Sequence, residues 1–154
     1  MNRRWYWYVV GAFALGLLQK LLFDRLLIYG AKPDLLLLLT TWIARREGQS
    51  VGIMAGFSIG LLMDLMRGTL GLEAFAKTVS GFVAGFFSNP DDFDKVSNFL
   101  WATALAAFFG TSAYELVSSA LQTPFFKWTL LATLTSLYNL LFGYAFFEGA
   151  KRFA

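Results

Sequence analysis

The sequence predicts an all-α integral membrane protein with six transmembrane helices in one polytopic domain, residues 1–154. Two observations on composition lead there: 57% of the residues are hydrophobic and only 15% are charged, whereas soluble domains have about 45–50% apolar and about 25% charged residues. The third observation is length. A spanning helix takes about 20 residues plus a connection, so the 154 residues hold at most about six spans and no additional soluble domain.

The residue types that are missing exclude several classes of function. The chain has no Cys and no His, which excludes a disulfide, a thiol nucleophile, a histidine base and the usual structural zinc sites. A protease that used carboxylates alone would need two aspartates on facing helices, and only Asp64 lies near the predicted membrane interior. The net charge of +3 is too small to indicate binding to nucleic acid. We therefore expect a membrane protein that is not an enzyme and uses no cofactor or metal.

The first predicted helix covers residues 5–23, an apolar run without the small-residue cleavage site of a secretory signal peptide. We interpret it as an uncleaved membrane helix. Arg3 and Arg4 precede it and favour a cytoplasmic N-terminus, because basic residues concentrate on the cytoplasmic side of membrane helices. An aromatic belt at the interface is predicted for Trp5, Tyr6, Trp7 and Tyr8.

The second predicted helix covers residues 34–45 and is short for a membrane span, at about 18 Å. Pro33 and Asp34 suit its start, because the missing N–H of proline is harmless there and a carboxylate is favoured at the positive helix end. Two arrangements would complete the crossing. Either the corner at Pro33 dips into the membrane, or residues 26–30 cross as irregular chain buried within the protein.

The later helices follow from longer apolar runs. Asn89 is predicted to cap the fifth helix, with Pro90 in its first turn. An even number of spans returns the C-terminus to the cytoplasm. Lys and Arg are divided almost evenly between the two sides, so this orientation depends on the paired arginines at the N-terminus. The predicted ranges are 49–66, 70–87, 91–122 and 124–147.

Four glycines recur at every fourth residue and form a smooth strip along the third helix: Gly48, Gly52, Gly56 and Gly60. Another helix backbone can lie directly against such a strip. One interpretation is packing inside the protein, which Gly81 on the next helix favours as a matching small residue. The other is a docking surface for the helix of a partner.

Two acidic residues need an explanation in so apolar a chain. Asp64 either forms an ion pair with Arg67 at the helix end, or faces a cavity or organises the loop that follows, where Gly68 and Gly71 permit a tight turn. Glu115 is predicted deep within the fifth helix. It is a hydrogen-bonded structural acid, part of an ion or proton relay, or a contact in a ligand cavity.

The order and spacing of these features resemble those of the rod shape-determining protein MreD family, small membrane proteins of bacteria. The likeness covers residues 32–85, about a third of the chain. It consists of Pro33-Asp34 opening a short helix, a basic turn, Gly56 and Gly60 followed by Asp64, the loop Arg67-Gly68-Thr69-Leu70-Gly71, and a further glycine-bearing helix.

The resemblance implies a non-enzymatic scaffold of the cell-wall elongation complex in the bacterial inner membrane. Such a protein would bind the single-span protein MreC and associate with MreB, RodA and its partner transpeptidase. The family is also similar in fold to the S-components of energy-coupling-factor transporters. This second similarity supplies the alternative function, a membrane carrier that binds a small molecule.

Overall fold

The computed structural model describes residues 3–21, 31, 33–69, 71–118 and 124–153, and these residues are overwhelmingly helical. The all-α class is confirmed. Among the described residues, three helices are long and apolar enough to cross a membrane, namely α3, α5 and residues Phe126–Arg152 of α6, while the six-span arrangement stays a prediction. In the described part of the chain the elements are α1 (Arg3–Leu21), α2 (Leu35–Glu47), α3 (Gln49–Arg67), α4 (Leu72–Gly85), the 3₁₀ turn η2 (Pro90–Asp92), α5 (Val96–Ser118) and α6 (Phe125–Phe153).

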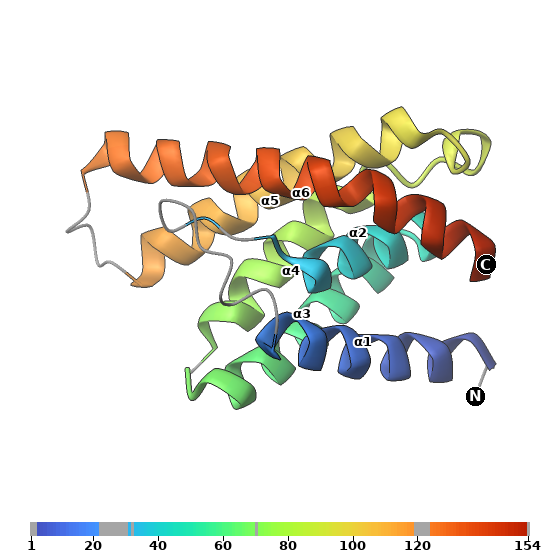
Figure 1. Ribbon diagram of the computed structural model, residues 1–154, viewed down its shortest axis with the longest axis horizontal. Helices are drawn as coiled ribbons and strands as arrows, with labels where there is room; N and C mark the ends of the chain where they lie inside the picture. The colour runs from blue at the N-terminus through green and yellow to red at the C-terminus, as the bar shows by residue number, and fades with distance from the viewer. Residues whose placement is uncertain (1–2, 22–30, 32, 70, 119–123, 154) are drawn as a thin grey trace.

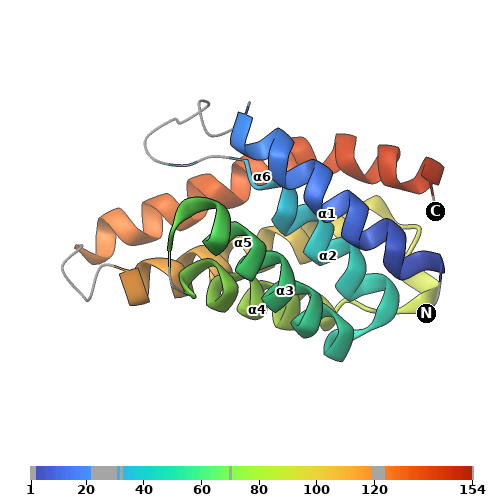
Figure 2. The ribbon, with the colours of Figure 1, turned by 90° about the horizontal axis from the view of Figure 1, so that it is seen from below.

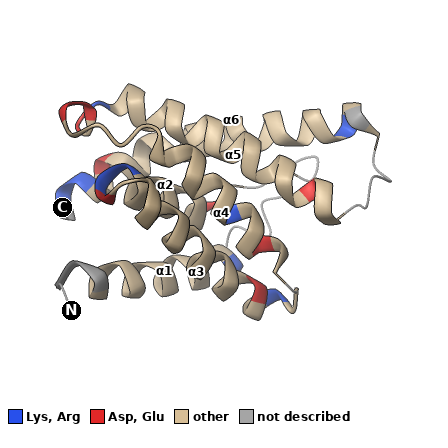
Figure 3. Ribbon diagram, turned by 180° about the vertical axis from the view of Figure 1, so that it is seen from behind, with Lys and Arg blue, Asp and Glu red and all other residues tan. Residues whose placement is uncertain are grey.

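The helices alternate in direction. Helices α1, α3 and α5 run one way and α2, α4 and α6 run the other way, so the N- and C-termini lie at the same end of the bundle (Figure 1). Figure 2 shows α1 on the outside, along α2 and α3. Charged residues gather at the two ends of the bundle, and a smaller group lies between them on α4 (Figure 3).

Helix α2 is the central element. All residues from Leu35 to Arg45 are buried, as expected for a helix that is apolar on every side. One side of α2 packs with α1 and α3 through Leu36, Leu39 and Ile43. The other side packs with α5 and α6, where the rings of Trp42, Phe99 and Phe147 meet edge to face or tilted.

The short second helix begins much as predicted. Asp34 is its N-cap, and the side chain accepts a hydrogen bond of 2.9 Å from the backbone N–H of Leu37. The helix ends at Glu47, after the two arginines of its last turn. Gly48, with a φ of 96°, then separates α2 from α3. The two arrangements considered for residues 26–30 lie outside the described residues.

The predicted start of the fifth helix at Asp91 is wrong. Asn89 accepts a hydrogen bond of 3.2 Å from the backbone N–H of Asp91, but it caps a single 3₁₀ turn, and α5 begins only at Val96. The backbone carbonyls of Asp92 and Phe93 accept hydrogen bonds from Arg45 of α2. This tertiary contact holds the segment before α5 in place. The predicted helix ends at residues 23 and 122 lie outside the described residues.

Candidate functional site

The glycine strip packs inside the molecule against α4. A Cβ atom built on Gly52 would lie 2.9 Å from the carbonyl oxygen of Gly81, one on Gly56 would lie 2.8 Å from the carbonyl carbon of Lys77, and one on Gly60 would lie 2.6 Å from the backbone nitrogen of Ala74. Real Cβ atoms essentially never approach this closely. The backbones of α3 and α4 are therefore in direct contact, and a side chain at these positions would separate the two helices.

Gly48 does not belong to this strip, which corrects the prediction. It lies at the junction of α2 and α3, and a Cβ atom built there would have nothing within 4 Å. Its φ of 96° is in the range that L-residues with side chains rarely adopt. Gly48 therefore serves the turn between two helices, not the contact between α3 and α4.

Asp64 joins the end of α3 to the start of α4. Its carboxylate accepts hydrogen bonds from the Thr69 hydroxyl (2.5 Å), from the backbone N–H of Glu73 (3.1 Å) and from that of Ala74 (2.9 Å). A carboxylate near the N-terminus of a helix is also favoured by the helix dipole. Of the two interpretations considered for Asp64, this geometry matches the one in which it organises the loop.

The loop that Asp64 organises needs two glycines. Gly68 ends α3 with a φ of 72°, and its N–H donates to the backbone carbonyl of Asp64. Gly71, with a φ of 78°, lies directly before α4. Both glycines have left-handed backbone conformations, which carry little steric penalty only when no Cβ is present. Arg67, in the last turn of α3, forms an ion pair with Glu73 in the first turn of α4.

A buried network of charges connects three helices. Lys77 of α4 is 4% exposed, and its ammonium group pairs with Asp34 at the start of α2 and with Glu73 one turn earlier on α4 (3.5 Å). Through Glu73 the network continues to Arg67 of α3. Asp34 is also fixed by its backbone N–H, which donates to the Asn139 side chain of α6 at 2.9 Å. Opposite charges within the bundle offset the large penalty of burying each one alone.

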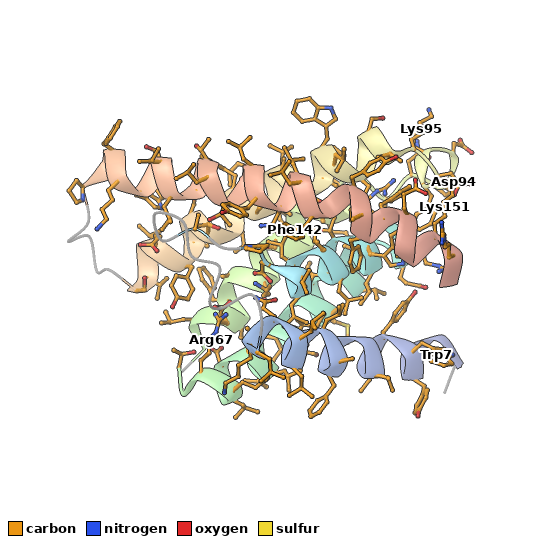
Figure 4. All side chains as sticks on the ribbon, viewed as in Figure 1. Trp7, Arg67, Asp94, Lys95, Phe142 and Lys151 are labelled. Atoms are coloured by element: carbon orange, nitrogen blue, oxygen red, sulfur yellow. The ribbon has the colours of Figure 1, made fainter. Side chains whose placement is uncertain are left out.

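The network lines one side of a cavity of about 170 Å³ between α2, α3, α4, α5 and α6. Arg67, labelled in Figure 4, is one of the residues that line this cavity. The opposite walls carry hydroxyl groups, from Thr111 and Tyr114 on α5 and from Thr135 on α6. The cavity therefore combines paired ions with uncharged hydrogen-bonding groups.

Glu115 also lines this cavity. Glu115 lies on α5, three residues before Ser118, the last described residue of this helix. Its side chain is half-buried. Its place in the lining is compatible with a contact in a ligand cavity and with a hydrogen-bonded structural acid, so the role of Glu115 stays a prediction.

The sequence analysis missed Glu73 and Lys77 as members of the site. The sequence does indicate this pair, because an acid and a base four residues apart can pair on one face of a helix. A lysine within an apolar helix also requires a partner. The identity of the second partner, Asp34, could not be read from the sequence. It is 43 residues away and meets Lys77 only because α2 packs against α4.

A second cavity, a mainly apolar groove of about 400 Å³, lies between α1 and α3. Helix α1 is held near both ends: the Tyr8 hydroxyl donates to Glu47 (2.8 Å), and the Lys20 ammonium donates to the backbone carbonyl of Met66 (2.7 Å). Between these two contacts the groove is lined by Val9, Ala12, Phe13, Ile43, Met54, Ala55, Ser58, Ile59 and Leu62, together with Tyr8 at one end.

Two of the residues that carry the resemblance to the MreD family, Asp34 and Arg67, line the first cavity. Pro33 is buried beside Asp34 at the start of α2, and Asp64 fixes the loop that follows Arg67. Comparison with family models, with curated proteins and with solved structures found no match. Membership of that family is therefore a proposal.

Proposed function

We propose that this chain is an MreD-like scaffold of the bacterial cell-wall elongation complex, embedded in the inner membrane by six spans with both termini in the cytoplasm. Within the part of the chain that the structure describes, three helices have the length and hydropathy of membrane spans. The alternating direction of all six helices supports the fuller arrangement, because it brings the ends of the chain to one side (Figure 1). Arg3 and Arg4 support the cytoplasmic orientation of that side.

The groove between α1 and α3 is the observation that carries this proposal. Lipid tails are as apolar as leucine, so membrane helices associate through close packing rather than through exclusion from water. Ala12, Ala55 and Ser58 are small residues that allow a helix backbone to approach, and Met54 beside them is 65% exposed. We assign the groove to the single transmembrane helix of an MreC-like protein, with MreB, RodA and its partner transpeptidase as further members of the complex.

The composition supports a role without catalysis. The chain has no Cys or His, and the charged groups of Asp34, Glu73 and Lys77 within the bundle pair with one another. Such an arrangement stabilises a fold and leaves few groups to transfer protons or attack a substrate. Binding of a partner within the membrane requires none of these groups.

Cysteine cross-linking in the native host tests the proposal, since the chain has no cysteine of its own. Ser58→Cys places a thiol in the groove, and it should form a disulfide with cysteines introduced along one face of the MreC helix. Leu141→Cys on α6 is the control, because it is 75% exposed and lies outside the groove. Equal cross-linking from both positions, or none from Ser58, would refute docking in the groove. Depletion of the chain should turn rods into round cells, and normal rods would refute the scaffold role.

One observation favours a second candidate function, that of a small-molecule carrier similar to S-components. This is the polar cavity between α2, α3, α4, α5 and α6, which docking of a partner in the α1–α3 groove does not use.

A further inference from the structure

The polar cavity has room for a small organic molecule. Its volume is about 170 Å³, and its walls belong to α2, α3, α4, α5 and α6. A protein cavity of about 150 Å³ can hold benzene, so a ligand that fills this cavity has on the order of six to eight non-hydrogen atoms. The chemistry of the walls then decides which class of molecule fits.

The charged side chains in the lining disfavour a charged ligand. Three of them are acidic (Asp34, Glu73 and Glu115) and two are basic (Arg67 and Lys77), so their formal charges sum to −1. An anion would face the three carboxylates, and a cation would face the guanidinium and the ammonium group. The ion-pair network of four of these residues offers a ligand no charge that is not already paired. The cost of taking a charged ligand out of water would therefore not be fully offset.

The wall formed by α5 and α6 carries three hydroxyl groups that make no hydrogen bond to the described part of the chain, those of Thr111, Tyr114 and Thr135. Other hydroxyl groups are satisfied by backbone. Thr133, on the same helix as Thr135, donates to a carbonyl of its own helix at 2.8 Å. The Ser80 hydroxyl, which lines the cavity from α4, lies 3.0 Å from each of two backbone carbonyl oxygens. The hydroxyl groups of α5 and α6 are therefore the ones available to a ligand.

A molecule with several hydroxyl groups on a short carbon chain matches this wall. Tyr114 and Glu115 follow Thr111 by three and four residues, so all three side chains lie on one face of α5. Hydroxyl groups of a ligand can donate to the carboxylate of Glu115, and they can both donate to and accept from the hydroxyl groups of the wall. Leu37 and Leu131 provide apolar contact for the carbon atoms.

We propose that this cavity binds an uncharged polyol of about the size of glycerol, held by the hydroxyl groups of α5 and α6. The proposal rests on the second candidate function, that of a small-molecule carrier, and not on the scaffold role. Two sources offer this chemistry: a soluble polyol, and the glycerol headgroup of an uncharged membrane lipid.

The experiment uses the purified full chain in nanodiscs of phosphatidylcholine, whose headgroup has no hydroxyl group. Glycerol and erythritol are added separately over the millimolar range while the melting temperature is measured. Sorbitol, about twice as large as glycerol, measures the general stabilisation that polyols give to folded proteins. Ethylamine, acetate and glycine are the charged probes. In a second arm, monoacylglycerol replaces part of the lipid, and native mass spectrometry measures how much of it stays bound.

We expect glycerol or erythritol to raise the melting temperature in a saturable way, as ligand binding to the folded state requires, or monoacylglycerol to stay bound. Sorbitol should give no saturable rise, and the charged probes should leave the melting temperature unchanged. A saturable shift with soluble polyols alone identifies a soluble ligand. Retention of monoacylglycerol alone identifies the headgroup.

Variants that remove one hydroxyl group locate the effect. Thr111→Val and Thr135→Val keep the shape of the side chain, and both should fold because neither hydroxyl bonds to another described residue. Loss of one hydrogen bond should weaken binding about threefold to tenfold in either arm. Thr133→Val is the matched control and should bind as the wild-type protein does, because Thr133 is exposed on α6 and outside the lining. Tyr114→Phe takes the place of a valine variant that does not fold.

Two results would overturn the proposal while the carrier function survives: a shift with a charged probe and none with a polyol, or polyol binding that the variants at Thr111, Tyr114 and Thr135 leave unchanged. If no probe bound in either arm, both the polyol site and the carrier function would be refuted. Cross-linking from Ser58 is unaffected by these outcomes and tests the scaffold separately.

Discussion

Removal of the central cation, by Lys77→Met, tests the buried charge network. Lys77 is 4% exposed and pairs with both Asp34 and Glu73, so methionine would leave two carboxylates without the ammonium group between them. Loss of one partner from a buried ion pair costs about 3–5 kcal/mol, because the remaining charge stays buried without compensation. A change of 1 kcal/mol shifts the melting temperature of a chain of this length by about 2–4 °C, so we expect a fall of about 6–20 °C.

Intrinsic tryptophan fluorescence during heating, combined with elution from a sizing column in detergent, measures this change. Thr78→Ala is the matched control, because the neighbouring hydroxyl only donates to the backbone carbonyl of Ala74 and its loss should cost about 1 kcal/mol. In the double variant Lys77→Met with Asp34→Asn, the carboxylate that lost its ion-pair partner is gone while Glu73 keeps its pair with Arg67, so part of the stability should return. If Lys77→Met had the same melting temperature as the wild-type protein, or if the double variant were no more stable than the single one, the network would not hold the helices together.

Three further predictions follow from the packing and the turns. Gly56→Leu should reduce the yield of folded monomer, because α3 and α4 are in direct contact there. Gly11→Leu is the control and should not reduce the yield, because a Cβ atom at that position would have nothing within 4 Å. Normal folding of Gly56→Leu would contradict the direct contact. Asp64→Leu should lower stability more than Asp64→Asn, since each buried donor left without an acceptor costs about 1–3 kcal/mol. Equal loss of function in folded forms of both variants would show that the charge itself matters. An impermeant thiol reagent should label Ser50→Cys from the cytoplasm and Lys127→Cys from the periplasm, and labelling of both from one side would refute the topology.

The local features of this fold could be predicted from the sequence. Pro33 and Asp34 predict the start of α2 because capping depends on a few neighbouring residues, and the structure shows the expected hydrogen bond to Leu37. The spacing of Gly52, Gly56 and Gly60 predicts a smooth face because the period of a helix is fixed, and that face is where α4 packs. In both cases the cause and its effect lie within a few residues of each other.

Features that depend on distant residues could not be predicted. The start of α5 at Val96 depends on Arg45, whose hydrogen bonds to the carbonyls of Asp92 and Phe93 hold the preceding segment outside the helix. The partner of Lys77 depends on how α2 and α4 approach. Gly48 was wrongly placed in the strip for a different, local reason: its spacing fits the helical period, but its backbone conformation belongs to the turn between α2 and α3.

The two candidate binding sites share one mechanical element, the pair of helices α3 and α4. One face of α3 presents Gly56 and Gly60 to α4, and another presents Ala55 and Ser58 to the groove. Lys77, whose backbone carbonyl carbon lies against Gly56, carries its side chain into the polar cavity. Because the contact between the two backbones has no room for a methyl group, α3 cannot shift toward or away from a partner without moving the helix that bears the charge network. Occupation of the groove and of the cavity would therefore act on the same rigid pair, from opposite faces.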